Sequence, residues 1–122
     1  MNVVPRPNEE DVAFNDPYTV ELEDGEEAEV TFTPEQSGST FYLATVAISK
    51  VRGTVYELED DATPMYGPAN IPPTDIDDLT VTWAPCKQFK DSLTVYIRNF
   101  TGNIQTYHVQ PIGFERADGG GA

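Results

Sequence analysis

Apolar and polar residues alternate with a period of two over several parts of this chain, and this pattern most constrains its fold. Residues 18–23, 28–33 and 93–98 each place apolar side chains at every second position. Such alternation is typical of β-strands that bury one face and expose the other. No helical period of three or four residues persists in the sequence. The chain is therefore predicted to be all-β.

Turn-forming residues separate the alternating segments at short intervals. Asp24-Gly25 lies between the first two, so residues 18–22 and 28–32 are predicted to pair as an antiparallel hairpin. Residues 79–83 also alternate and predict a further strand. Seven or eight short strands in one domain predict an antiparallel β-sandwich of the jelly-roll or immunoglobulin-like type, and a small barrel fits the same pattern.

The 122 residues divide into three expected regions. Residues 1–17 are predicted to form an extended N-terminal arm, because three prolines in this segment block regular strand pairing. Residues 18–115 are predicted to form the sandwich, and residues 116–122 a flexible, glycine-rich tail. Apolar side chains in the arm predict that it docks on its own sheet or on a neighbouring molecule.

Two segments carry more apolar residues than a one-sided strand requires. Residues 40–50 have apolar side chains on both faces, which predicts a second sheet on one face and the arm or a partner on the other. Residues 62–77 contain four prolines and are expected to form a long, ordered loop. A partner interface is predicted at apolar residues of the arm and of this loop, namely Val3, Val4, Phe14, Met65, Tyr66 and Ile71.

The charge of the chain restricts where it can work and what it can bind. There are 21 Asp and Glu residues against 7 Lys and Arg, a formal charge of −14. Such a chain repels itself in dilute buffer, but concentrated salt screens the repulsion, because the Debye length falls to about 3 Å at 1 M. The composition favours a halophilic setting over that of an acidic mesophilic protein. Nucleic acid and anionic membranes are disfavoured as partners, since both require clustered Lys and Arg.

Few residues have the spacing of a catalytic or metal site. His108 is the only histidine and Cys86 the only cysteine, so no catalytic triad, internal disulfide or zinc ligand set is expected, and the chain is predicted not to be an enzyme. Asp75, Asp77 and Asp78 resemble part of a calcium-binding loop and predict a structural cation, although their spacing departs from that of an EF-hand. The alternative is a loop of solvated carboxylates.

A modification site is also encoded in the sequence. Asn99-Phe100-Thr101 is an acceptor triplet for N-glycosylation. It lies at a predicted turn between strands, where a glycan on Asn99 could project from the domain. This prediction applies only if the protein is exposed to a glycosylating compartment.

Two further segments carry a resemblance to known proteins. They are Tyr66-Gly67-Pro68-Ala69-Asn70-Ile71-Pro72-Pro73-Thr74-Asp75-Ile76-Asp77-Asp78 and Leu93-Thr94-Val95-Tyr96-Ile97-Arg98-Asn99 with the following Thr101-Gly102 turn. Together with the acidic composition, they resemble the small β-sandwich structural proteins of tailed viruses that infect halophilic archaea. The likeness extends over residues 18–115.

The resemblance implies a virion protein that decorates or cements an icosahedral capsid or forms a vertex turret. It implies symmetric homo-oligomers in contact with capsid or other virion proteins, and no cofactor beyond the possible cation. A tail or baseplate component of the same kind of virus is the alternative. Two other classes stay open. One is a carbohydrate-binding or adhesive sandwich on the extracellular surface of a halophile, with Trp83, Tyr42 or Tyr96 exposed in a row; the other is a small hydrolase.

Overall fold

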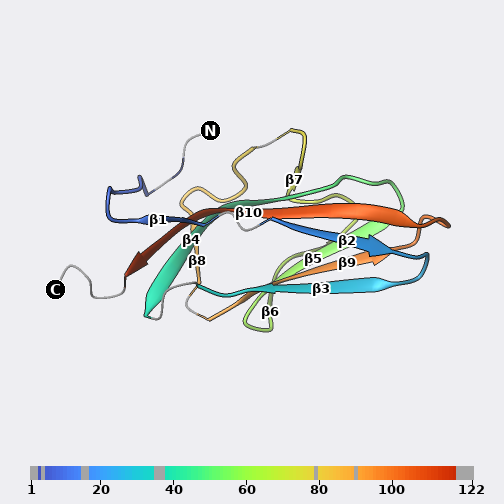
Figure 1. Ribbon diagram of the computed structural model, residues 1–122, viewed down its shortest axis with the longest axis horizontal. Helices are drawn as coiled ribbons and strands as arrows, with labels where there is room; N and C mark the ends of the chain where they lie inside the picture. The colour runs from blue at the N-terminus through green and yellow to red at the C-terminus, as the bar shows by residue number, and fades with distance from the viewer. Residues whose placement is uncertain are drawn as a thin grey trace.

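The structure is a computed structural model that describes residues 3, 5–14, 17–34, 38–78, 80–89 and 91–117, without the side chains of Phe14 and Ala117. In this part of the chain all regular structure is β, arranged as two sheets packed face to face (Figure 1). A helix of the length and apolar character needed to cross a membrane does not occur among these residues. The strands are β1 (Val12–Phe14), β2 (Tyr18–Leu22), β3 (Glu27–Phe32), β4 (Ser39–Ile48), β5 (Thr54–Asp60), β6 (Thr63–Ala69), β7 (Thr74–Asp75), β8 (Lys87–Phe89), β9 (Leu93–Asn99) and β10 (Gln105–Ala117).

The first sheet is built on the two longest strands, β4 and β10, which pair antiparallel. β1 and β2 lie along the other edge of β10 in one continuous register, in which Val12 faces Glu115 and Leu22 faces Gln105. The free edge of β4 holds β8, which runs antiparallel to it, and β7, which runs parallel. The sheet is therefore four strand positions wide, although six strands contribute to it.

The second sheet contains β3, β9, β5 and β6 in that order, and each neighbouring pair is antiparallel. The chain crosses from one sheet to the other after β2, β3, β4, β6, β8 and β9, and the first long strand, β2, lies beside the last, β10. With β7 and β8 taken as one position, this is the strand order of an eight-stranded jelly roll. An immunoglobulin-like sandwich would place its first two strands side by side in one sheet. The prediction of an antiparallel β-sandwich is thus confirmed, and the strand order is that of the jelly-roll type.

Alternate residues of both sheets fill the space between them. Leu58 and Ile97 of the second sheet are completely buried there. Phe41 of β4 and Phe89 of β8 stack with their ring centroids 4.9 Å apart, and both are at most 1% exposed. The strands therefore bury the apolar side of the period-two pattern, because association of the two apolar faces removes them from water.

The outer face of β4 is covered by the segment that connects β7 to β8. Thr45 and Ala47 alternate with core residues and point away from the core, yet they are at most 1% exposed. The backbone oxygen of Ala44 accepts hydrogen bonds from the backbone nitrogens of Thr82 and Trp83, both at 3.0 Å. The hydroxyl groups of Thr45 and Thr82 lie 2.7 Å apart. The prediction that this strand is covered on both faces is thus confirmed, but at Thr45 the cover comes from the chain's own loop and not from the arm or a partner.

A β-bulge in β4 makes this covering contact possible. The pairing of β4 with β10 skips Ala44, so its carbonyl oxygen is available to the covering loop. On the opposite strand, a Cβ atom at Gly113 would overlap the carbonyl oxygen of Tyr42. The close approach of the two backbones therefore requires glycine at this position.

Three predictions of secondary structure are corrected by the structure. β2 and β3 do not form a hairpin, because each buries its apolar face in the common core and the turn at residues 23–26 carries the chain from one sheet to the other. Residues 63–69, predicted to lie in a loop, form β6 and pair with β5. Residues 80–86 form no strand, because their backbone nitrogens bind the bulge of β4 instead of a regular neighbour.

The N-terminal segment is fixed to its own sheet by β1 and by one ion pair. Arg116 donates to both carboxylate oxygens of Asp11, from Nε to Oδ1 at 3.0 Å and from Nη2 to Oδ2 at 2.8 Å. The hydrogen bonds from Arg116 lower the pKa of Asp11, whose side chain is only 3% exposed. Of the two docking alternatives, the structure thus shows docking on the chain's own sheet. The last strand also continues two residues past the predicted end of the sandwich at 115.

Candidate functional site

The loops that connect β2 to β3, β4 to β5 and β9 to β10 meet at one end of the sandwich, which we call the loop end (Figure 1). We name residues 23–26 the acidic loop, residues 49–53 the basic loop and residues 100–104 the central loop. The central loop lies between the other two and is hydrogen-bonded to both. Gly102 donates from its backbone nitrogen to Oδ1 of Asp24 at 2.9 Å, and Phe100 donates to the carbonyl oxygen of Gly53 at 2.9 Å.

The buried side chain of Asn99 organises the central loop. Its Nδ2 atom donates to the carbonyl oxygens of Leu22 at 2.9 Å and Asn103 at 2.8 Å, and its Oδ1 atom accepts from the backbone nitrogen of Thr101 at 2.9 Å. The residue is 0% exposed. A glycan on Nδ2 would displace at least one of these bonds, and the buried position offers it no path to solvent. The folded structure therefore gives Asn99 a structural role and no support to the glycosylation hypothesis.

Exposed apolar side chains concentrate at the loop end. Phe100 and Ile104 of the central loop are 59% and 58% exposed, and Ile71, in the connection from β6 to β7, is 56% exposed. Among the large apolar side chains that the structure describes, only Tyr18 joins these three as exposed. Groups of exposed apolar side chains on a domain commonly mark contact surfaces.

The charges of the loop end are divided between its two outer loops. Glu23, Asp24 and Glu26 of the acidic loop are exposed, as are Lys50 and Arg52 of the basic loop. Neither Lys50 nor Arg52 forms an ion pair with another described residue. The loop end therefore carries acidic, apolar and basic side chains in that order across its surface.

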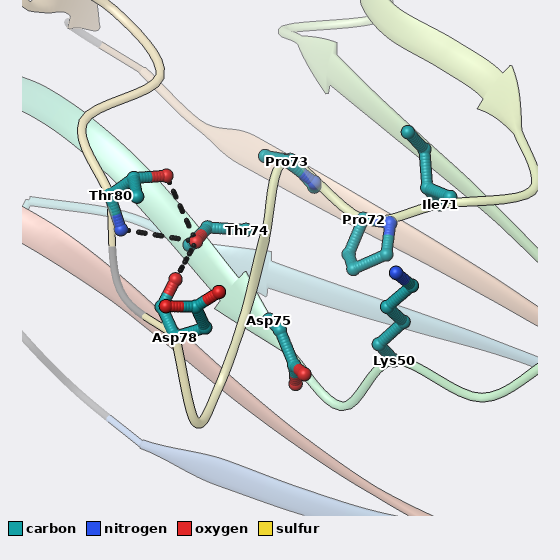
Figure 2. Close-up of a pocket in the computed structure, with 8 residues that line it drawn as sticks. All are labelled: Lys50, Ile71, Pro72, Pro73, Thr74, Asp75, Asp78 and Thr80. Carbon is teal, nitrogen blue, oxygen red and sulfur yellow. Dashed lines mark hydrogen bonds between the residues drawn. The ribbon is translucent and has the colours of Figure 1, made fainter.

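An open pocket lies beside the basic loop (Figure 2). The hydroxyl group of Thr74 donates to the carbonyl oxygen of Asp78 at 2.8 Å and accepts from the backbone nitrogen and hydroxyl of Thr80 at 3.1 and 3.2 Å. The pocket volume is about 190 Å³, whereas small-molecule sites usually begin at about 300 Å³. Its lining consists of Lys50, Ile71, Pro72, Pro73, Thr74, Asp75, Asp78 and Thr80.

Two of the three aspartates of the predicted cation site, Asp75 and Asp78, line this pocket, but the three do not converge. Asp75 ends β7, and its Oδ1 atom accepts from the backbone nitrogen of Asp77 at 3.5 Å. Asp77 and Asp78 are exposed. In the described part of the chain, no group of three His, Cys, Asp or Glu side chains is placed to hold a metal ion. The structural cation therefore stays a prediction of the sequence alone.

The residues of the predicted partner interface are dispersed. Met65 and Tyr66 pack against the core, and the Tyr66 hydroxyl donates to the carbonyl oxygen of Ile71 at 2.8 Å. Val3 is half-buried, and the backbone of Phe14 pairs with β10 in β1. Val4 and the side chain of Phe14 lie outside the described residues. Among those of the six side chains that the structure describes, Ile71 alone is exposed, and it lies beside Lys50 of the basic loop.

The outer face of the second sheet is acidic and bare. Glu27 and Glu57 flank Arg98, with their Oε1 atoms 3.1 Å from Nε and 3.0 Å from Nη2 respectively. A hydrogen bond to Glu59 raises the pKa of Tyr96 on the same face to about 12, because the carboxylate disfavours a phenolate. This face presents solvated carboxylates, with the half-buried side chains of Val55 and Tyr96 among them.

The side chains weighed for catalysis and sugar binding are not assembled into a site. The Nδ1 atom of exposed His108 is 2.9 Å from the hydroxyl of Thr19, and Cys86 is buried. Tyr42 stacks on Phe114 of the first sheet with ring centroids 4.9 Å apart, whereas Tyr96 lies on the outer face of the second sheet. Since these faces are opposite, the two tyrosines cannot form one aromatic row.

Comparison with known proteins adds no relative, because no protein-family model, curated protein or solved structure matches the chain. The loop end is therefore the candidate functional site on physical grounds. Sequence reasoning identified only Ile71 of its exposed apolar residues. The signal for Phe100 and Ile104 was present, since both are apolar residues next to the turn Thr101-Gly102-Asn103, where burial in a strand is excluded.

Proposed function

We propose that this chain is a non-enzymatic structural protein of a virus particle that works in concentrated salt. It decorates or cements an icosahedral capsid or forms a vertex turret, and it contacts its neighbours through the loop end. A tail or baseplate component would use the same surface and is the alternative location.

The observation that carries the proposal is the concentration of exposed apolar side chains at one end of a jelly roll, where three of the four large ones in the described part of the chain lie. Phe100, Ile104 and Ile71 gather there, while the outer face of β4 is covered and that of the second sheet is acidic. Such a molecule offers neighbours one adhesive end and keeps its remaining surface hydrated. Adhesion without chemistry is what a particle protein requires.

The charge of the chain supports concentrated salt as the working medium. At −14, each copy repels the next over a Debye length of about 30 Å at 0.01 M salt, which falls to about 3 Å at 1 M. Copies can therefore approach more closely as added salt screens their carboxylates. This expectation is consistent with the resemblance to proteins of viruses of halophilic archaea.

The carbohydrate-binding alternative has weaker support. The open pocket is small, and Tyr42 and Tyr96 lie on opposite faces of the sandwich. No aromatic platform of the kind that sugars stack on results from this arrangement. We therefore do not advance it as a second function.

The proposed function is tested by locating the chain in a culture of its source. Virus particles are purified on a density gradient at high salt, and the fractions are analysed for this chain by mass spectrometry. The chain is expected to co-sediment with intact particles and to be released when the salt is lowered. Recovery only with the cell envelope or with the cell interior would contradict the proposal.

A further inference from the structure

We propose that the loop end is the contact surface of a two-fold dimer, in which a second copy of this chain docks end to end. This inference rests on the proposed function and deepens it by naming the partner of the loop end. It follows from the order of charges and apolar side chains across that surface.

The order is fixed by hydrogen bonds between the loops. The backbone nitrogen of Gly25 donates to the carbonyl oxygen of Asn99 at 2.6 Å, and the backbone nitrogen of Asn99 donates to the carbonyl oxygen of Glu26 at 3.0 Å. Since Asn99 directly precedes the central loop, the acidic loop lies on one side of that loop. The bond from Phe100 to Gly53 places the basic loop on the other side. A Cβ atom at Gly53 would be 3.2 Å from the Cα atom of Thr101, which shows how closely these two loops approach.

A two-fold axis through the central loop matches this surface to itself. Phe100 and Ile104 of one copy then meet the same residues of the other, and each acidic loop faces a basic loop. Interfaces of this type are self-complementary, because every contact occurs twice. Most other ways of joining two copies of so acidic a chain bring carboxylates against carboxylates, which costs free energy.

The basic loop makes a second copy the best partner. Lys87, Arg98 and Arg116 are each paired with carboxylates inside the chain. Lys50 and Arg52 are exposed and form no ion pair with the residues that the structure describes. In the two-fold arrangement the acidic loop of the second copy supplies carboxylates to both cations, in addition to Asp75 and Asp78, which line the same pocket as Lys50 without forming an ion pair with it.

The size of the surface predicts a weak dimer. Strands lie about 4.8 Å apart and sheets about 10 Å apart, so the end of a sandwich four strands wide measures about 20 Å across the strands and about 10 Å between the two sheets. This area is smaller than the roughly 800 Å² per partner of a stable specific interface. Many copies held on one particle would strengthen such a contact through their high local concentration.

Charge reversal with exchange of partners provides the test. Arg52→Glu and Glu23→Lys each place like charges across the two-fold contact, and both side chains are exposed, so the fold is expected to persist by circular dichroism. Arg6→Glu, in the N-terminal segment, is the control that changes the net charge as much as Arg52→Glu does. Sedimentation equilibrium is measured at protein concentrations up to about 1 mM in 0.15 M salt, where the Debye length of about 8 Å leaves contacting charges only partly screened.

The wild type and Arg6→Glu are expected to dimerise, and each loop-end variant alone should dissociate about tenfold more readily. An equimolar mixture of Arg52→Glu and Glu23→Lys is expected to recover dimers, because opposite charges then face each other at both contacts. A monomeric wild type, unchanged variants, or a mixture without recovery would each overturn the proposal. If the chain nevertheless co-sediments with virus particles, the proposed function stands and only the two-fold contact fails.

Discussion

The outward side chains of the two sheets differ in how far they are exposed to water. On the first sheet, the segment between β7 and β8 covers Thr45 and Ala47 so completely that both are at most 1% exposed. On the second sheet, Glu27 and Glu29 stand in water beside Arg98 and Tyr96, and no segment of the described chain lies over them. The outer face of β4 is thus covered by the chain's own loop, whereas the outer face of the second sheet exposes charged side chains to water.

This difference explains where the adhesive surface of the molecule lies. The apolar surplus of β4 suggested a partner when read from the sequence, but the chain satisfies that surplus itself. The acidic face, in turn, contains none of the exposed large apolar side chains that the structure describes. Exposed apolar side chains therefore remain chiefly at the loop end, where the two sheets stop and turns replace strands.

The largest effect on the stability of the fold is expected at Gly113, which lies opposite the bulge in β4. Gly113→Ala places a methyl group against the backbone oxygen of Tyr42, so β4 and β10 must separate locally. We expect a loss of about 3 kcal/mol in the free energy of unfolding, measured with urea. Thr106→Ala, at an exposed position of the same strand, is the control and should cost less than about 0.5 kcal/mol. Equal effects of the two substitutions would show that the bulge is not under this constraint.

Matched threonine pairs on the two sheets sharpen the comparison. Thr45→Val breaks the bond to Thr82 under the covering loop, whereas Thr31→Val breaks the bond to Thr94 on the open face, where the hydroxyls are 3.2 Å apart. Loss of the bond under the covering loop is expected to cost about 1 kcal/mol, because the Thr82 hydroxyl then keeps only its long bond, 3.4 Å, to the carbonyl oxygen of Pro73. The exposed site should change stability by only a few tenths of a kcal/mol. Thermal or urea unfolding measures the stability of both variants. A larger loss of stability in Thr31→Val than in Thr45→Val would contradict this prediction.

Acid is expected to release the N-terminal segment from the first sheet. The folded-state pKa of Asp11 is lowered below 3.8 by Arg116, so the ion pair stabilises the docked segment above that pH. The stabilisation is lost as the pH falls through the lowered pKa. Relative to the intrinsic exchange rate at each pH, residues 12–14 should lose protection from hydrogen exchange in acid more than β9 does, and Asp11→Asn should lower this protection already at neutral pH. Unchanged protection in Asp11→Asn would show that the ion pair does not hold the N-terminal segment on the first sheet.

The smallest effect is expected on the acidic face. Glu29 forms no ion pair with a described cation, so Glu29→Gln relieves repulsion and should stabilise the chain by about 0.3 kcal/mol at 0.01 M salt. The gain should disappear at 1 M salt because the charges are then screened. Glu27→Gln is the contrast, since it removes a partner of Arg98 and should bring no such gain. A salt-independent effect of Glu29→Gln would mean that repulsion is not its cause.

The sequence predicted the fold class because the period-two pattern survives in most strands. It failed where long-range pairing decides the outcome. The turn at residues 23–26 satisfies the local rules of a hairpin, but β2 and β3 find their neighbours 80 or more and about 65 residues away, in β10 and β9. Trp83 lies in an alternating segment, yet its backbone nitrogen donates to the carbonyl oxygen of Ala44 at the β4 bulge, outside any regular strand pairing. No local pattern encodes such a contact.

The candidate site was less predictable than the fold. Ile71 was identified because an apolar residue in a proline-rich loop has no strand to bury it. Phe100 and Ile104 are likewise apolar residues outside a strand, but the triplet that begins at Asn99 predicts a glycosylation site at this turn instead. The basic loop could not be predicted as part of a site from the sequence. Lys50 and Arg52 stand out only because the fold places them at one end of the molecule, near acidic residues.

Hydrogen exchange of associated and dissociated protein tests most directly whether the loop end is the contact surface. Exchange is followed by mass spectrometry in 1 M salt, first in dilute solution and then at the concentration where copies associate. Slower exchange is expected in residues 100–104 and in the flanking loops 23–26 and 49–53, with no change across β3 and β9. Protection of the acidic face, with the loop end unchanged, would contradict the central claim that this molecule adheres by one end.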